Sequence, residues 1–224
     1  MVTNHKKPLL IAHRGDSQGF PENSMSAFES AFLLGADGVE LDIHEHGGEL
    51  IVVHNYNFDR SGSYPKLHDV LERFASSGRL EIEIKTIGLS FLEPLQKLLA
   101  PYTKCDIELT TSVAGLFAYL RPAFPNVKLG SIFLDKEFEP WMLEENDFYI
   151  TKVVDSMKLY DANIAHIPYS ACTQNMVNAV HASGKYVHTN LAGQPSDKQR
   201  EIYTHLSQLG VDQVTFDYMG LCDK

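Results

Sequence analysis

Cysteine is scarce in this chain, and long hydrophobic runs are missing. The three cysteines, Cys105, Cys172 and Cys222, are odd in number and widely spaced, which excludes a dense disulfide framework and suits a reducing compartment. No pair of them has the spacing of a metal-binding motif. The apolar run ending at Ala12 is too short for a signal sequence, and no segment reaches the length of a membrane span. These absences predict a cytoplasmic protein without stable membrane insertion.

Positive charge is also in short supply. The chain has 19 Lys and Arg residues against 29 Asp and Glu residues, which gives a net charge of −10. This balance argues against nucleic acid or an anionic membrane surface as a standing partner. An anionic substrate would therefore need a local cluster of cations. The length of 224 residues and a hydrophobic content of 44% predict one soluble domain over residues 1–224, while the oligomeric state stays open.

Apolar segments alternate with helix-like segments along the whole chain. Dividing 224 residues by eight units gives 28 residues for each strand, helix and pair of loops, which favours a (β/α)8 TIM barrel in the α/β class over an open sheet. The eight expected strands are residues 9–12, 38–43, 80–84, 106–109, 127–133, 163–167, 186–189 and 213–216. A short extra strand over 49–53, after a Gly-Gly turn, is expected to return His54 to the barrel mouth.

The first helix has clear signals at both ends. Asn23 or Ser24 can cap its N-terminus, Ser26 and Glu29 have capping-box spacing, and Gly35 is expected to end it.

Polar residues follow the apolar strands near the N-terminus, where a parallel barrel places its chemistry. His13 and Arg14 come directly after the first strand, and Arg14 suits either a phosphoryl group or a structural ion pair. Glu40 and Asp42 are two residues apart, so both side chains point to one face of the second strand. That face is either an exposed surface or a site for a cation that prefers oxygen ligands.

The alternation from Glu81 to Lys85 is, taken alone, typical of a half-solvated antiparallel strand. Most of the ten histidines suit ordinary surface or core roles. His13 and His54 differ because each follows an apolar strand, and a pair of imidazoles can move two protons near neutral pH.

Several motifs together resemble one known family. They are His13-Arg14-Gly15, Pro21-Glu22-Asn23, Glu40-Leu41-Asp42, Val53-His54-Asn55 and Glu83-Ile84-Lys85. In this order they resemble the glycerophosphodiester phosphodiesterase family, whose fold is a TIM barrel of the phospholipase C-like phosphodiesterase type. The resemblance spans nearly the whole chain and is loose over residues 100–160. It implies metal-dependent hydrolysis of glycerophosphodiesters to glycerol 3-phosphate and an alcohol, a reaction of lipid metabolism with a small-molecule phosphodiester as partner.

The resemblance also implies a role for each matched residue. Glu40, Asp42 and Glu83 would hold a divalent cation, Mg²⁺ or Ca²⁺. His13 and His54 would act as general acid and base, in an order that stays open. The phosphate would contact Arg14 and Lys85. Possible outer positions are Glu22, Asn23 and Asn55, of which Asn23 can equally serve only as a helix cap. Glu81 has no family counterpart and is expected to be structural.

Four departures from the family pattern affect the expected pocket. Asn55 stands where Asp is usual, and His188 and Phe216 replace a usual Trp and Thr. Only residues 61–64 separate Arg60 from Pro65, so the family insertion, around residues 44–79, is reduced and the site should be more open.

The departures keep other functions in view. Sphingomyelinase D-like or sugar-phosphodiester enzymes are the nearest, and Tyr56, Phe58 and Tyr64 could serve a lipid substrate or simply pack. A non-catalytic barrel that binds a phosphoryl ligand is a second class. A metal-dependent sugar isomerase or aldolase fits the fold but not His13-Arg14-Gly15.

Overall fold

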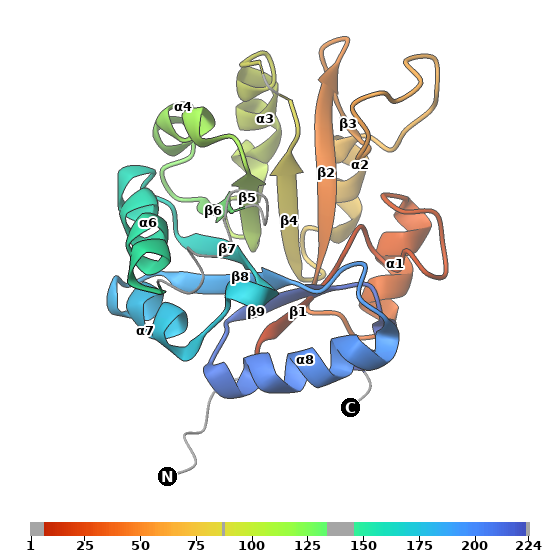
Figure 1. Cartoon of the computed structure of the whole chain (residues 1–224). Helices are drawn as coiled ribbons and strands as arrows, with labels where there is room; N and C mark the ends of the chain where they lie inside the picture. Colours follow the sequence, from red (N-terminus) through yellow and green to blue (C-terminus); the bar gives the residue numbers. More distant parts are fainter. Residues whose placement is uncertain (1–6, 87, 134–145, 223–224) are drawn as a thin grey trace.

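Eight parallel strands close into a barrel in the computed structural model, which describes residues 7–86, 88–133 and 146–222 (Figure 1). The strands are β1 (Leu9–Ala12), β2 (Gly38–His46), β4 (Arg79–Ile84), β5 (Ile107–Thr111), β6 (Lys128–Ile132), β7 (Ile164–Pro168), β8 (Tyr186–Asn190) and β9 (Gln213–Phe216). The barrel closes where β1 pairs with β2, with Ile11 opposite Gly38. The predicted (β/α)8 fold is confirmed.

All eight predicted strands are present, with small shifts at their ends. The largest difference is in β2, which continues to His46 because its last residues pair with the antiparallel strand β3 (Glu49–Val52). This short strand confirms the expected turn back toward the barrel mouth. The Val53 N–H then donates to the Asp42 carbonyl oxygen at 3.0 Å, which fixes the chain beside the end of β2 immediately before His54.

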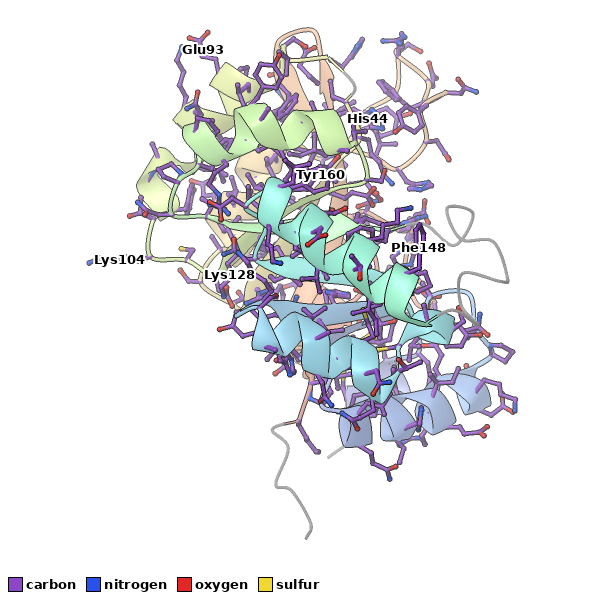
Figure 2. The ribbon with its side chains drawn as sticks, turned by 60° about the vertical axis from the view of Figure 1, so that its left-hand side comes forward. His44, Glu93, Lys104, Lys128, Phe148 and Tyr160 are labelled. Carbon is purple, nitrogen blue, oxygen red and sulfur yellow. The ribbon has the colours of Figure 1, made fainter. Side chains whose placement is uncertain are left out.

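Helices surround the barrel (Figure 1). They are α1 (Met25–Leu33), α2 (Leu67–Phe74), α3 (Leu92–Leu99), α4 (Phe117–Ala123), α6 (Asn146–Leu159), α7 (Gln174–Ala182) and α8 (Ser196–Leu209), with short 3₁₀ turns at Ala100–Tyr102, Ala114–Leu116, Tyr169–Ala171 and Met219–Cys222. Figure 2 brings α4, α6 and α7 forward; between the first two, Tyr160 stacks on Phe117 with ring centroids 4.8 Å apart. Within the described ranges, no helix has both the length and the apolar character needed to cross a bilayer.

The N-terminus of helix α1 confirms one of the two predicted capping residues and contradicts the predicted capping box. The Ser24 side chain accepts from the Ala27 N–H at 3.2 Å, so Ser24 is the N-cap. The capping box of Ser26 and Glu29 is wrong, because the box position opposite Ser24 is Ala27 and Glu29 instead pairs with Arg73. The predicted end at Gly35 is confirmed by its left-handed φ of +96°.

The apolar core lies between the strands and the helices, whereas the barrel interior is lined largely by polar side chains. Glu40, Glu81 and Glu108 occupy facing positions on β2, β4 and β5, and all three are buried. TIM barrels usually fill this space with branched apolar residues. Buried charges require paired or liganded neighbours, so the interior of this barrel is where its chemistry should be sought.

Candidate active site

A cavity of about 340 Å³ opens at the carboxyl ends of the barrel strands. Its lining includes the sequence-predicted residues His13, Arg14, Glu40, Glu83 and Lys85. Parallel strands bring their C-terminal ends to one edge of the barrel, which is why residues far apart in the sequence meet here. The structure therefore brings these five predicted residues together, with Asp42 beside them, whereas the predicted His54 does not line the cavity.

Three carboxylates from two neighbouring strands converge at this cavity. Each of Glu40, Asp42 and Glu83 offers one oxygen, and these oxygens lie within 4.8 Å of one another. Glu40 and Asp42 are only 5% and 1% exposed, so the alternative of an exposed strand face is wrong. Burial, together with the charges of Asp42 and Glu83, raises the pKa of Glu40 well above its ordinary value. Such crowding is unfavourable unless a cation neutralises it.

Two basic side chains partly balance the three carboxylates. The Lys85 Nζ lies 2.7 Å from a Glu83 oxygen and 3.3 Å from Asp42 Oδ1. Arg14 Nε lies 3.3 Å from Asp42 Oδ2. Burial opposes the charge of both basic groups, but the neighbouring carboxylates outweigh it and raise the pKa of each. Lys85 and Arg14 therefore stay charged beside the site, where an anionic group can contact them.

The chemistry of the donor set fits a divalent cation that prefers oxygen. All three candidate ligands are carboxylates, and Asp42 Oδ1 is buried without a hydrogen bond, with the Lys85 Nζ 3.3 Å away. A buried carboxylate oxygen that has an ion pair but no hydrogen bond, in a negatively crowded position, is further stabilised by a metal ion. Mg²⁺ and Ca²⁺ are the ions that suit this ligand type.

Asn23 makes two hydrogen bonds to Asp42 and does not cap the helix. Its Nδ2 donates to Asp42 Oδ2 at 2.9 Å, and its Oδ1 accepts from the Asp42 N–H at 3.2 Å. Asn23 has a left-handed φ of +57°, which asparagine tolerates better than most residues. Glu22, the other predicted outer residue, accepts from Arg14 Nη1 at 2.8 Å. Both residues thus orient groups that border the cavity.

We expect Asn23 and Ser24 to separate site geometry from helix stability. Glycine adopts the left-handed backbone conformation readily, so Asn23→Gly removes only the two hydrogen bonds to Asp42. Cation affinity should then fall about 10- to 100-fold. Ser24→Ala removes the helix cap and should cost about 1 kcal/mol of unfolding free energy with little change in cation affinity. Calorimetric titration with Mg²⁺ and thermal melts in chelator measure the two effects. Equal cation affinity in the wild type and Asn23→Gly would contradict the positioning role of Asn23.

Gly15 is explained by packing rather than by ligand approach. A Cβ at Gly15 would lie 2.6 Å from the Ala27 carbonyl carbon, and its φ is +80°. The glycine therefore lets the turn after β1 press against α1, which sets the direction in which His13 and Arg14 enter the cavity.

His13 is held by an aspartate that the sequence reasoning did not single out. His13 Nδ1 lies 2.9 Å from Asp217 Oδ1, and Asp217 Oδ2 accepts from the Gly193 N–H at 2.6 Å. Burial opposes the charge of Asp217, but these bonds outweigh it and lower its pKa. An ionised Asp217 fixes the ring of His13 through Nδ1, and Nε2 is the ring nitrogen that Asp217 does not contact. The signal for Asp217 was its place directly after the last expected strand.

His54 lies apart from the other candidate residues. It follows β3 at the barrel mouth, and its Nδ1 is 3.4 Å from Asn55 Oδ1, but it does not line the cavity. In the same loop, Phe58 packs edge-on against Tyr64, and Arg60 lies 5.3 Å from the Phe58 ring centroid. Ordinary packing thus accounts for Phe58 and Tyr64, while Tyr56 is 56% exposed.

Two histidines to which the sequence gave no catalytic or metal-binding role lie inside the barrel; His188 was expected only to alter the shape of the pocket. His166 on β7 and His188 on β8 face each other in register and stack, with ring centroids 4.0 Å apart. Both are buried, and both line the cavity together with Glu81. Their signal in the sequence was a histidine inside each of two successive predicted strands, 163–167 and 186–189. Among the remaining histidines, His5 lies outside the described residues.

Comparisons with known proteins agree with this architecture. The sequence model of the Glycerophosphoryl diester phosphodiesterase family matches residues 13–70 of this chain. A glycerophosphodiester phosphodiesterase of Caldanaerobacter subterraneus is 28% identical over 60% of this chain and 70% of the relative, and one of Bacillus altitudinis is 25% identical over 93% and 94%. A phosphodiesterase of Oleispira antarctica, solved with its product sn-glycerol-3-phosphate, superposes with a TM-score of 0.78 at 18% identity, covering 96% of this chain and 95% of that one.

The barrel and the named relatives define the class of this protein as a phosphoric diester hydrolase. Within that class, the family model, the named relatives and the solved structures together support membership of the glycerophosphoryl diester phosphodiesterase family. The resemblance seen in its motifs is thereby confirmed.

Proposed function

We propose that this enzyme hydrolyses glycerophosphodiesters to glycerol 3-phosphate and an alcohol, with a divalent cation, Mg²⁺ or Ca²⁺, held by Glu40, Asp42 and Glu83. The observation that carries the proposal is the convergence of these carboxylates with Arg14, Lys85 and His13 on one cavity. The relatives' shared activity, and the product bound in the Oleispira neighbour, support the choice of substrate.

The charge of the site suits a phosphodiester once a cation is bound. Three carboxylates and two basic groups carry a formal charge of −3 + 2 = −1 when all are ionised. A divalent cation changes this to +1, which attracts a phosphodiester monoanion into a protein of net charge −10. The chemistry that such a cation supplies is polarisation of a phosphoryl oxygen. Arg14 and Lys85 add charge-assisted hydrogen bonds to the remaining oxygens.

Proton transfer falls to the two histidines in this proposal. A hydroxyl oxygen forms the new bond to phosphorus while the bond to the leaving alkoxide breaks. Attack by water gives glycerol 3-phosphate directly, whereas attack by a neighbouring substrate hydroxyl gives a cyclic phosphodiester that water must then open to glycerol 3-phosphate. One imidazole takes the proton of the attacking hydroxyl, and the other delivers a proton to the alkoxide. Asp217 orients His13 for one of these steps. We assign the second role to His54, although its side chain does not line the cavity. The hydrogen bond from the Val53 N–H to the Asp42 carbonyl oxygen supports this assignment, because it fixes the chain next to His54 beside the end of β2.

The test is release of glycerol 3-phosphate from glycerophosphocholine and glycerophosphoethanolamine, with added Mg²⁺ or Ca²⁺ and with chelator. We expect release with a metal ion and none with chelator. Release that is independent of metal would contradict the cation's role. If neither substrate is cleaved while sphingomyelin-type or sugar phosphodiesters are, the leaving group has been assigned wrongly. Binding of glycerol 3-phosphate without any cleavage would instead support a non-catalytic barrel.

A further inference from the structure

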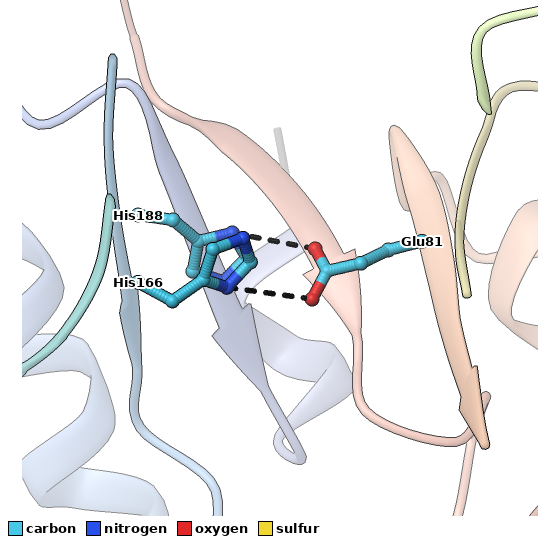
Figure 3. Close-up of side chains that lie close together, drawn as sticks. All are labelled: Glu81, His166 and His188. Carbon is cyan, nitrogen blue, oxygen red and sulfur yellow. Dashed lines mark ion pairs between the residues drawn. The ribbon is translucent and has the colours of Figure 1, made fainter. Parts of the chain in front are cut away.

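Below the carboxylates and basic groups of the proposed site, the cavity wall includes a second, buried cluster. It consists of Glu81 on β4, His166 on β7 and His188 on β8, drawn in Figure 3. The two carboxylate oxygens of Glu81 point at the two rings: Oε1 lies 3.7 Å from His166 Nδ1, and Oε2 lies 3.3 Å from His188 Nδ1. One donor atom from each residue lies within 4.8 Å of the others.

The outer nitrogen of each ring is already held by a hydrogen-bond partner. His166 Nε2 lies 2.6 Å from Glu108 Oε1, and His188 Nε2 lies 2.7 Å from Thr215 Oγ1. Because Glu108 can only accept when ionised, its bond favours a proton on His166 Nε2. Both Nδ1 atoms are then directed toward Glu81. Histidines that bind metals almost always hold their second nitrogen in this way, often on a carboxylate.

Glu81 lacks a dedicated cationic partner within the part of the chain that the structure describes. Its Oε2 is buried without a hydrogen bond, although the residue is only 3% exposed. The guanidinium of Arg79, which favours the charged form of Glu81, is already bonded to Asp106, Glu108 and Gln213. Burial and the neighbouring carboxylates raise the pKa of Glu81, so this carboxylate is stabilised either by a proton or by a further positive charge such as a metal ion.

The backbone of β6 leaves space for this cluster. A Cβ at Gly130 would lie 2.5 Å from both Glu108 Oε1 and His166 Nε2. Any larger residue would push the histidine and its carboxylate apart. Gln213 also contacts the cluster. Its amide oxygen accepts a hydrogen bond from Arg79 Nη1, and its Nε2 lies 3.2 Å from His188 Nδ1.

We propose that Glu81, His166 and His188 form a second metal site, for a nitrogen-preferring ion of the Zn²⁺ class. A tetrahedral Zn²⁺ site with bonds of about 2.1 Å separates its ligand atoms by about 3.4 Å. One donor atom from each of the three residues lies within 4.8 Å of the others, so small side-chain adjustments bring one Glu81 oxygen and the two rings to that spacing. Binding requires Gln213 to give up its contact with His188. The three protein ligands leave a fourth position, and all three residues line the cavity, so this position is open to a small ligand.

The two sites should select different ions. Glu40, Asp42 and Glu83 offer oxygen ligands only, whereas the second cluster offers two imidazoles and one carboxylate. The second site is a property of the folded barrel and does not depend on the proposed hydrolysis. Its test therefore measures metal binding rather than turnover.

The experiment uses the untagged full chain, stripped with chelator and then held in excess Mg²⁺ to occupy the oxygen site. Co²⁺ is titrated while visible absorption is recorded, and Zn²⁺ is titrated in competition with a chromophoric chelator. We expect one equivalent of each ion to bind, with the intense absorption of four-coordinate Co²⁺. His166→Gln and His188→Gln should each weaken Zn²⁺ binding at least about tenfold. Thermal melts verify that the variants remain folded.

Two controls decide the location of the ion. His181→Gln changes a half-exposed histidine that pairs with Asp212 on the outside of the barrel, and it should leave Zn²⁺ binding unchanged. Glu83→Gln should weaken Mg²⁺ binding but retain the Co²⁺ absorption. The proposal is overturned if wild-type protein in Mg²⁺ shows no four-coordinate Co²⁺ spectrum. It is equally overturned if folded His166→Gln and His188→Gln variants bind Zn²⁺ as the wild type does.

Discussion

His13→Ala should lower turnover of a glycerophosphodiester by about 10²- to 10⁴-fold, the contribution of a positioned proton-transfer group. His13 lines the cavity, and Asp217 holds its Nδ1 at 2.9 Å. The ring makes no contact with Glu40, Asp42 or Glu83 among the hydrogen bonds and ion pairs of the described residues. Mg²⁺ binding should therefore remain essentially unchanged. Steady-state kinetics and calorimetric titration measure these two properties on the same preparation.

His68→Ala is the matched control, because His68 is exposed on α2 and pairs only with its neighbour Asp69 among the described ion pairs. It should turn over substrate as the wild type does. Asp217→Asn keeps the shape of the positioning residue but removes its charge, so turnover should fall because the ring of His13 is oriented less firmly. Unchanged turnover in His13→Ala would refute the proton-transfer role.

Glu40→Gln should abolish most activity and yet stabilise the metal-free protein. Glu40 is buried against Asp42 and Glu83, and burial and these charges raise its pKa. The neutral amide keeps the volume and removes one of three crowded charges. Without a cation, we expect the melting temperature to rise by about 2–4 °C for each kcal/mol of repulsion relieved. With Mg²⁺, turnover should fall about 10²- to 10³-fold, because electrostatic stabilisation of the reaction is lost.

The effect on stability should depend on pH with a definite sign. Because the pKa of Glu40 is higher in the folded chain, the folded state binds the proton more tightly than the unfolded state does. This contribution is fully present below the ordinary value of 4.5 and is lost as pH rises through the raised pKa. In chelator, the melting temperature should thus decline across that range, and less steeply in Glu40→Gln. Glu49→Gln, at an exposed pair with Lys66, is the control.

A destabilised Glu40→Gln variant in chelator would contradict the repulsion argument. Retention of metal-dependent turnover by that variant would show that Glu40 is not needed to hold the cation.

The strands of this barrel could be predicted from sequence because they are short apolar segments separated by helix-like segments. Their ends shifted where tertiary pairing overrides the local pattern, as in β2, which β3 extends to His46. The capping box at Ser26 failed for a similar reason, since Glu29 has a partner on another helix, Arg73. Local spacing contains no information about such a partner.

The candidate site also contains residues that local motifs predict and residues that only tertiary contacts bring into the site. Glu40, Asp42, Glu83, Arg14 and Lys85 could be singled out because they stand in compact motifs at strand ends, and the structure brings them together. Asp217 and His166 were missed, and His188 was noted only as a departure from the family pattern, because each acquires its meaning from a residue more than 50 positions away. Only barrel closure creates those contacts.

The pairing of β4 with β2 has a consequence for how sequence changes are tolerated. Glu81 and Glu83 face Glu40 and Asp42 along this pair, and Leu80 and Ile82 point the other way, into the apolar core. Inserting or deleting one residue before β4 would exchange the two faces of the strand, because side chains alternate with a period of two. Gly78 is the exception on residue type, because a Cβ at this position would lie 2.5 Å from the Asp37 carbonyl oxygen. Apart from Gly78, the loop between α2 and β4 should therefore tolerate changes of residue type far better than changes of length.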